Sequence, residues 1–214
     1  MPPPSSVPYA SFLRYSPRGT SPSSVASRGW VAAVKGDGLY GRMRAIDVSA
    51  SKLAQELSRY TVLSDCLAGG VLVPAPRSAP QYGGGLWPTK RLCEAMVAAG
   101  VGTGVFPALR RTLAVQKSAT AARGQRPTVR RHYETIAVEQ DRSLLAAGTR
   151  LVVVDDVVTR GATFLACHRR LSEAYPDAAV CCFALTRTIS DAEVGGMLDP
   201  VAGVITLEPL HREP

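Results

Sequence analysis

Residues 150–171, RLVVVDDVVTRGATFLACHRRL, decide the fold of this chain. The stretch begins with an unbroken apolar run at 151–154, places Asp155 and Asp156 directly after it, and continues through a short Thr/Gly loop into a segment with helical periodicity. Consecutive apolar residues, rather than alternating ones, are typical of a strand that is covered on both faces. The stretch therefore predicts a buried parallel strand followed by a loop and a helix.

The rest of the chain repeats this alternation of strands and helices. Apolar, strand-like runs lie at 69–76, 101–109, 134–140 and 178–188, and helix-like segments lie at about 48–63, 87–100 and 163–176. Strands that alternate with helices favour a parallel sheet with helices on both faces. We expect an α/β fold, a doubly wound and mainly parallel sheet with a small hood.

The predicted organisation has four parts. The Pro- and Ser-rich residues 1–29 are expected to form a flexible N-terminal arm, and residues 30–68 a hood and the first helix. Residues 69–190 form the core, and residues 191–214 a C-terminal edge element or tail. A chain of 214 residues is long enough for one substantial core.

Composition excludes several classes of protein. No apolar run approaches the roughly 20 residues that span a bilayer, and the N-terminus lacks the pattern of a secretory signal. The five cysteines have no metal-like spacing, and most lie in apolar segments. We therefore expect a cytoplasmic, soluble protein whose cysteines are reduced and serve in packing, as at Cys181 and Cys182.

Positive charge is concentrated in one part of the sequence. The formal net charge is +8, yet seven of the 25 basic residues lie between Glu94 and Glu134, an interval without any acidic residue. Such a local excess is expected where an anion binds. Residues 110–133, which carry these seven basic residues, have no usable apolar periodicity and are predicted to be a long mobile loop, with His132 on the surface beside the following strand.

The acidic pair and the Thr/Gly loop call for different ligand groups. In open parallel sheets, ligands bind at the carboxyl ends of the strands, where Asp155 and Asp156 are placed. The carboxylates repel a phosphate, so they face hydroxyls or a divalent cation, whereas the loop 159–163 at a helix N-terminus suits a phosphate. A sugar phosphate satisfies both demands. The alternative is that the two acids merely cap the next helix.

The stretch LVVVDDVVTRGAT resembles the phosphoribosyl pyrophosphate (PRPP) signature of type I phosphoribosyltransferases. VAAVKGDG, VLVPAPRSA and ALRRTLAVQKSATAARGQRP are similar to segments of the ComF-type branch of predicted phosphoribosyltransferases, whose N-terminal zinc module is absent here. The resemblance spans roughly residues 30–190 and is strongest at 150–163.

The resemblance implies a role for particular residues. Asp155 and Asp156 are implied to bind the ribose hydroxyls, directly or through Mg²⁺. Thr159, Arg160, Gly161, Ala162 and Thr163 are implied to hold the 5-phosphate, Arg77 and Ser78 the pyrophosphate, and Lys117, Arg123 and Arg126 to close over the leaving group.

The implied activity is Mg²⁺-dependent transfer of the phosphoribosyl group from PRPP to a small-molecule acceptor, with release of pyrophosphate. Thr159 stands where purine-salvage members carry an acid, which disfavours a 6-oxopurine acceptor. Two alternatives remain open: a PRPP- or nucleotide-sensing regulator without turnover, and a ComF-like DNA-associated accessory protein. Nucleic acid is disfavoured because the basic interval has few aromatic residues, and a homodimer is left open.

Overall fold

The computed structural model describes residues 6–81, 84–116, 127–139, 145–146, 148–207 and 211–212. Its helices and strands follow in the order β1 (Ser6–Tyr15), α1 (Pro22–Lys35), β2 (Leu39–Tyr40), β3 (Met43–Arg44), α2 (Ala45–Glu56), α3 (Thr61–Leu67), β4 (Val71–Pro74), α4 (Pro88–Ala98), β5 (Gly104–Val105), β6 (Leu109–Arg111), α5 (Val129–Glu134), β7 (Ile136–Val138), β8 (Arg150–Val158), α6 (Ala162–Ala174), β9 (Ala179–Thr188), β10 (Leu198–Thr206) and β11 (His211–Arg212).

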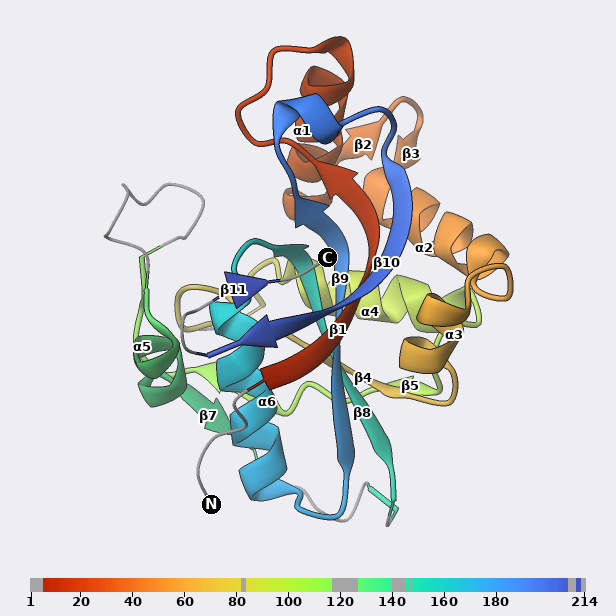
Figure 1. Ribbon diagram of the computed structural model, residues 1–214. Coiled ribbons are helices and arrows are strands. Elements are labelled where there is room, and N and C mark those ends of the chain that lie inside the picture. The colour runs from red at the N-terminus through yellow and green to blue at the C-terminus, as the bar shows by residue number, and fades with distance from the viewer. Residues whose placement is uncertain are drawn as a thin grey trace.

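The main sheet has seven strands in the order β11-β10-β1-β9-β8-β4-β5. The strands from β1 to β5 in this order pair in parallel, and β10 and β11 add antiparallel pairs at one edge. Helix α6 packs on one face of the sheet, and α3 and α4 on the other (Figure 1). The predicted α/β fold with a mainly parallel sheet is confirmed.

Strand β8 separates two cores, as its unbroken apolar run predicts. Leu151 and Val153 are buried in the core on the α6 side, and Val152 and Val154 in the core on the opposite side. Successive side chains of a strand point to opposite faces. Both faces of β8 are therefore buried, which explains why the apolar residues 151–154 do not alternate with polar residues.

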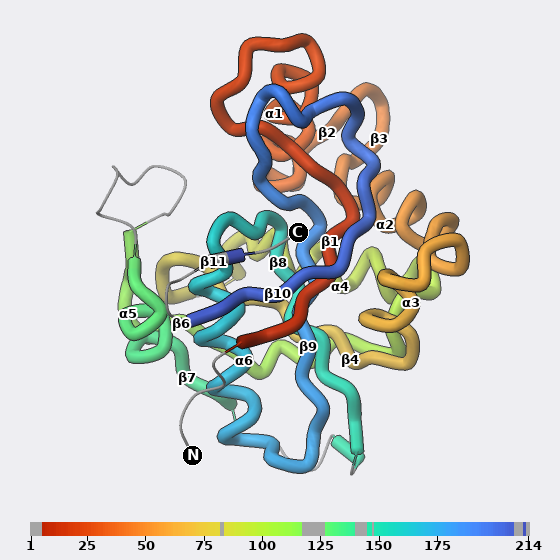
Figure 2. The backbone as a smooth tube through the Cα atoms, viewed as in Figure 1, coloured from red at the N-terminus to blue at the C-terminus, as the bar shows by residue number. Residues whose placement is uncertain are grey.

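The N-terminal segment differs from the flexible arm predicted for residues 1–29. Residues 6–15 form β1, which lies between β9 and β10 (Figure 2), and Val7 and Phe12 are fully buried. A proline such as Pro8 is unusual in a central strand, because proline cannot donate a ladder hydrogen bond. Parallel pairing with β9 begins only at Tyr9, so Pro8 needs no donor on that side.

Two further elements differ from the predictions. The helix expected at about 48–63 is divided into α2 and α3, and the turn between them lets both Leu53 and Leu63 reach the core. The basic interval is not a loop throughout: Thr128 caps α5 by accepting a hydrogen bond from the Arg131 amide at 3.1 Å. Strand β7, which follows α5, pairs with β6 in a separate two-stranded sheet.

Helix α1 and the β2–β3 hairpin form a small lobe at the upper end of the molecule in Figure 1, and we call this lobe the hood, although it overlaps only in part with the residues 30–68 predicted to form one. Ser21 caps α1 by accepting from the Ser24 amide, and Pro22 occupies the first turn, where a missing N–H costs nothing. The helix ends at Lys35, whose side chain reaches β8. The hood is thereby fastened to the carboxyl end of the sheet.

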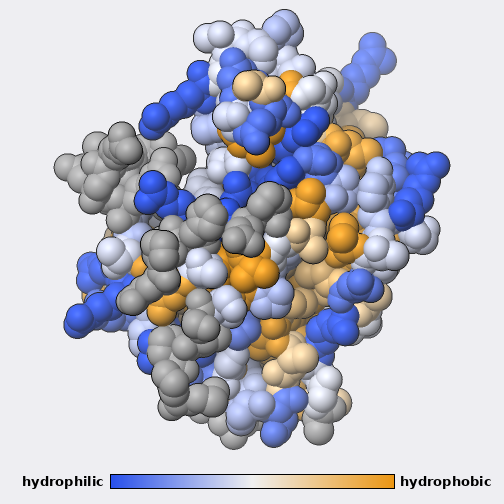
Figure 3. All heavy atoms as spheres, in the orientation of Figure 1, coloured by the Kyte–Doolittle hydropathy of each residue, from blue (hydrophilic) through white to orange (hydrophobic). Residues whose placement is uncertain are grey.

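Polar and apolar residues are distributed unevenly over the visible surface (Figure 3). Figure 3 shows hydrophilic residues around the rim of the visible face and apolar patches nearer its middle. Within the part of the chain that the structure describes, no helix is both long enough and apolar enough to cross a membrane.

Candidate functional site

Asp155 and Asp156 lie near the carboxyl end of β8 and leave it on opposite faces. Asp155 follows the side of Leu151 and Val153, which is the α6 side, and Asp156 follows the side of Val152. The Asp156 amide donates to Oδ1 of Asp155 at 2.9 Å. The two carboxylates are thus neighbours that present their oxygens in different directions.

Asp156 is held by a cation from the hood. Nζ of Lys35 lies 2.6 Å from Oδ2 of Asp156, whose side chain is only 14% exposed. Burial alone would lower the pKa of Lys35, but the charge of Asp156 and their hydrogen bond outweigh this effect and raise the pKa. Lys35 therefore stays protonated and fixes the position of the Asp156 carboxylate.

The ionised form of the Asp155 side chain is destabilised by its surroundings. Burial, and next the charge of Asp156, raise the pKa of Asp155 to about 7, although Lys35 acts in the opposite direction. Near neutral pH this carboxyl group accepts either a proton or a cationic or hydroxyl ligand at little cost. Such a group is suited to hydroxyls or to a metal that arrives with a substrate.

The loop after β8 leads into the N-terminus of α6. Gly161 is the N-cap residue of this 13-residue helix. Its φ is +85°, which lies in the left-handed region. A Cβ at this position would lie 2.5 Å from Cδ1 of Ile205 in β10. Gly161 is therefore required both by its backbone conformation and by the close approach of β10.

The other members of the predicted phosphate loop surround this helix end. Thr159, Ala162 and Thr163 are half-buried, and Arg160 is exposed. The first-turn amides of a helix carry partial positive charge and bind anions readily. The structure thus brings the predicted loop together at one helix end, directly after the acidic pair.

Arg77 and Ser78 lie in the loop after β4, which is the strand beside β8. The carbonyl of Arg77 accepts from Nε of Arg111 at 2.9 Å, and the carbonyl of Ser78 accepts from the Val115 amide at 2.7 Å. Protein donors therefore occupy these loop carbonyls. The Arg77 side chain itself is exposed, so it is accessible to an anion.

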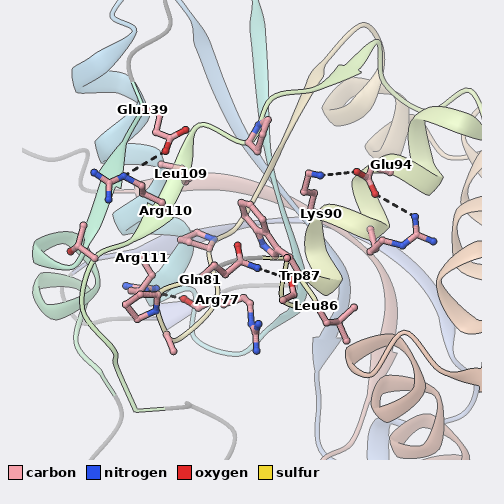
Figure 4. Close-up of a pocket in the computed structure, with 18 residues that line it drawn as sticks. Arg77, Gln81, Leu86, Trp87, Lys90, Glu94, Leu109, Arg110, Arg111 and Glu139 are labelled. Carbon is pink, nitrogen blue, oxygen red and sulfur yellow. Dashed lines mark hydrogen bonds and ion pairs between the residues drawn. The ribbon is translucent and has the colours of Figure 1, made fainter.

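A cavity of about 750 Å³ opens beside this loop (Figure 4). Two ion pairs lie on opposite sides of it: Lys90 with Glu94 at 2.9 Å, and Arg110 with Glu139 at 3.6 Å. The cavity is lined by Pro76, Arg77, Ala79, Pro80, Gln81, Gly84, Gly85, Leu86, Trp87, Lys90, Arg91, Glu94, Pro107, Leu109, Arg110, Arg111, Thr112 and Glu139. Neither the acidic pair nor the loop 159–163 lines it, so the cavity and the carboxyl end of β8 are adjoining but separate features.

A buried arginine supports the wall of the cavity. Arg111 is only 5% exposed; it donates to Oγ1 of Thr135 at 2.7 Å and lies 3.3 Å from Nδ1 of His132. His132 is 4% exposed, and burial followed by the charge of Arg111 lowers its pKa to about 4. The prediction that His132 lies on the surface is wrong: the ring is neutral and packed beside a cation that joins the Arg77 loop to α5.

Lys35 and Arg111 are the residues near the site that the sequence did not single out. Lys35 belongs to VAAVKGDG, a segment noted only for its resemblance, and Arg111 belongs to the basic interval. Lys117, Arg123 and Arg126, which were predicted to close over a leaving group, lie outside the described residues. No cluster of three or more potential metal ligands occurs among the residues with described positions.

No protein-family model matches the sequence, and no curated protein is similar to it. Solved structures are similar in fold: a glutamine mutant from an analysis of an invariant aspartic acid in HPRTs has 12% identity and a TM-score of 0.37, and the match covers 77% of this chain and 91% of that one. A hypoxanthine phosphoribosyl transferase from Trypanosoma cruzi has 12% identity and a TM-score of 0.36, with 77% and 87% covered. These likenesses are too distant to indicate a ligand, so the site residues must do so.

Proposed function

We propose that the protein is a phosphoribosyltransferase that moves the 5-phosphoribosyl group from PRPP to a small-molecule acceptor and releases pyrophosphate. One observation carries the proposal: within nine residues, 155–163, an acidic pair at a strand end is followed by a glycine-capped helix N-terminus. The acids suit hydroxyls and the helix end suits a phosphate. A phosphorylated sugar presents both groups.

The residues divide the ligand between them. Asp155 and Asp156 accept hydrogen bonds from the ribose hydroxyls, and Lys35 holds Asp156 in place. The amides and hydroxyls of Thr159, Arg160, Gly161, Ala162 and Thr163 bind the 5-phosphate. The sugar is thereby fixed at both ends, and its anomeric carbon is presented to the acceptor.

The donor atoms at the strand end fit Mg²⁺. The pair supplies carboxylate oxygens, which Mg²⁺ prefers, and proteins often bind this ion through one or two carboxylates together with substrate phosphates rather than in a complete protein cage. The raised pKa of Asp155 is consistent with a carboxyl group that gains from a nearby cation. When bound with PRPP, Mg²⁺ neutralises charge that develops on the departing pyrophosphate.

The positive residues receive the leaving group. We assign pyrophosphate to Arg77 and Ser78, where the exposed guanidinium of Arg77 lies at the cavity of Figure 4. Lys117, Arg123 and Arg126 are proposed to close over it, because electrostatic stabilisation of the leaving group is the largest effect available in such a displacement. Closure also excludes water, which otherwise hydrolyses the activated sugar.

The test is the release of pyrophosphate by the purified protein with PRPP and Mg²⁺, assayed across panels of bases, amines, phenols and carboxylates. An acceptor-dependent release supports the proposal, and Lys117→Ala should then lower turnover while leaving PRPP affinity unchanged. Tight PRPP binding without release for any acceptor would instead indicate a sensor. Binding to DNA that weakens steeply with salt and ignores PRPP would indicate the accessory role and contradict the proposal.

A further inference from the structure

Two cysteines that are far apart in the sequence lie against each other near the start of β9, three residue pairs before the acidic pair. Sγ of Cys66 on α3 lies 3.8 Å from Sγ of Cys181 on β9. The contact is reinforced, because the Cys181 thiol donates to the carbonyl of Cys66 at 3.3 Å and the Cys66 thiol reaches the carbonyl of Cys182 at 3.4 Å. A disulfide has a sulfur–sulfur distance of about 2 Å, so the two sulfur atoms have to approach each other by roughly 1.8 Å to bond.

The two thiols have different reactivities. The hydrogen bond from Cys66, together with the charge of Arg150, lowers the pKa of Cys181 against the opposing effect of burial. The same hydrogen bond and burial raise the pKa of Cys66. Cys181 is half-buried, whereas Cys66 is buried. Cys181 is therefore the more accessible and the more readily ionised of the two thiols, and Cys66 lies behind it.

The other three cysteines lack this arrangement. Cys93, Cys167 and Cys182 are buried, and burial raises the pKa of each thiol. Buried, protonated thiols react slowly with oxidants. The reactive pair is thus distinguished from the packing cysteines both by its geometry and by its access to solvent.

We propose that Cys66 and Cys181 form a reversible disulfide when hydrogen peroxide oxidises the protein. The Cys181 thiolate attacks one peroxide oxygen, so that an S–O bond forms, the O–O bond breaks, and hydroxide leaves and is protonated to water. The sulfur of Cys66 then attacks the sulfenic sulfur of Cys181, the S–S bond forms, the S–O bond breaks, and the departing hydroxide takes the Cys66 proton. In total, two thiols are oxidised and one peroxide is reduced to two waters.

The disulfide fastens α3 to β9 without touching the candidate site. It closes a chain segment of 115 residues, and such a long closure restricts the unfolded chain strongly. Cys181 pairs with Val152 and Ala184 pairs with Asp155, so the crosslink lies three residue pairs before the acidic pair along β8 and β9. Oxidation therefore raises stability and leaves ligand binding at the strand end unchanged, which makes this device independent of the proposed function.

The test treats the full chain with a small excess of hydrogen peroxide and measures the intact mass, the peptide linkage under non-reducing conditions, and the melting temperature. The expected results are a loss of about 2 Da, a single Cys66–Cys181 crosslink, and a rise of roughly 5–10 °C in melting temperature that a thiol reductant reverses. Cys181→Ser should abolish the mass loss and the rise, and the matched control Cys93→Ser should retain both.

Three outcomes would overturn the proposal. The first is a crosslink that joins any other pair of cysteines, and the second is oxidation of Cys181 to sulfinic acid without a crosslink. The third is formation of the Cys66–Cys181 bond with no change in melting temperature. Peptide mapping of the unmodified sequence decides the first two without any variant, so a folding defect in Cys181→Ser does not weaken the test.

Discussion

The carboxyl end of β8 and the cavity beside β4 are two neighbouring regions that are built in opposite ways. The first is contiguous in sequence, from Asp155 to Thr163, and burial together with the charge of Asp156 raises the pKa of Asp155 to about 7. The second gathers side chains from the loop after β4, from α4 and from β6 around about 750 Å³ and is rich in arginine and lysine. Two adjoining regions of opposite charge can divide one ligand between hydroxyls and anionic groups.

The difference also shows in how each region is supported. At the strand end, a single ion pair from Lys35 holds Asp156. At the cavity, the buried Arg111 joins the Arg77 loop to Thr135 and His132 through several hydrogen bonds. Removal of charge at the strand end should therefore act mainly on ligand affinity, whereas removal of charge behind the cavity should act first on stability.

The largest effect is expected from removing the charge of the acidic pair. The double variant Asp155→Asn, Asp156→Asn should lower the affinity for PRPP with Mg²⁺ by roughly 100-fold or more, because two charge-assisted contacts are lost. Isothermal titration calorimetry at pH 8, above the raised pKa of Asp155, measures this. The exposed Asp177→Asn is the matched control and should bind as the unmodified protein does. Unchanged affinity in the double variant would remove the acids from the ligand site.

Gly161→Ala tests the loop of the same region. The new Cβ has to adopt φ +85° and would lie 2.5 Å from Cδ1 of Ile205, so the variant should lose roughly 2–3 kcal/mol of unfolding free energy and bind phosphate less well. Urea denaturation measures the first effect. Gly29→Ala is the control: it lies within α1 and its Cβ meets nothing within 4 Å, so stability should stay equal or rise slightly. Equal stability of the two variants would contradict the close approach of β10.

The support of the cavity should make stability depend on pH. His132 has a pKa of about 4 in the folded chain against 6.5 when unfolded, so the unfolded chain binds more protons between these values and the unfolding free energy falls as pH decreases. Between pH 7.5 and pH 5 this histidine should account for about 2 kcal/mol.

His132→Gln should remove most of that pH dependence in urea denaturation. His168→Gln is the comparison, because burial also lowers the pKa of this half-buried histidine, but by less. If both variants lose stability on acidification as steeply as the unmodified chain, the buried contact between Arg111 and His132 is not the cause.

The smallest effect is expected at the open side of the cavity. Arg77→Ala removes an exposed cation and should weaken the binding of inorganic pyrophosphate about 5- to 10-fold, with no loss of stability. Competition binding at low and high salt measures this, since an exposed charge is screened by ions. Arg18→Ala removes an equally exposed cation from the segment between β1 and α1 and should have no effect. If both variants lose pyrophosphate affinity to a similar extent, Arg77 contributes only general electrostatic attraction and not a specific contact.

The carboxyl end of β8, which is contiguous in sequence, could be predicted from the sequence. The cavity beside β4, which is assembled from separate segments, could not. The order of strand, acids, loop and helix at 150–171 is encoded by neighbouring residues, so local sequence patterns predicted β8, the Thr/Gly loop and α6. Lys35 and Arg111 could not be assigned in this way, because they meet Asp156 and the Arg77 loop across 121 and 34 residues of sequence. No local pattern records such a separation.

The N-terminal segment also shows that contacts between distant segments decide structure, because here they overrode the local sequence pattern. Its Pro- and Ser-rich composition predicted an arm, yet 6–15 became an inner strand because β9 and β10 together offer it a partner on each edge and a core on each face. Tertiary burial outweighs weak local propensity when it removes residues such as Phe12 completely from water.

By itself, the sequence determined the alternation of strands and helices, the mainly parallel sheet, and the placing of an acidic pair and a glycine loop at one strand end, because each of these depends on residues within a few positions of one another. Only the tertiary structure decided that Lys35 holds Asp156, that His132 is buried beside Arg111, and that Cys66 lies against Cys181. Such contacts depend on how distant segments pack, and packing is a property of the whole core.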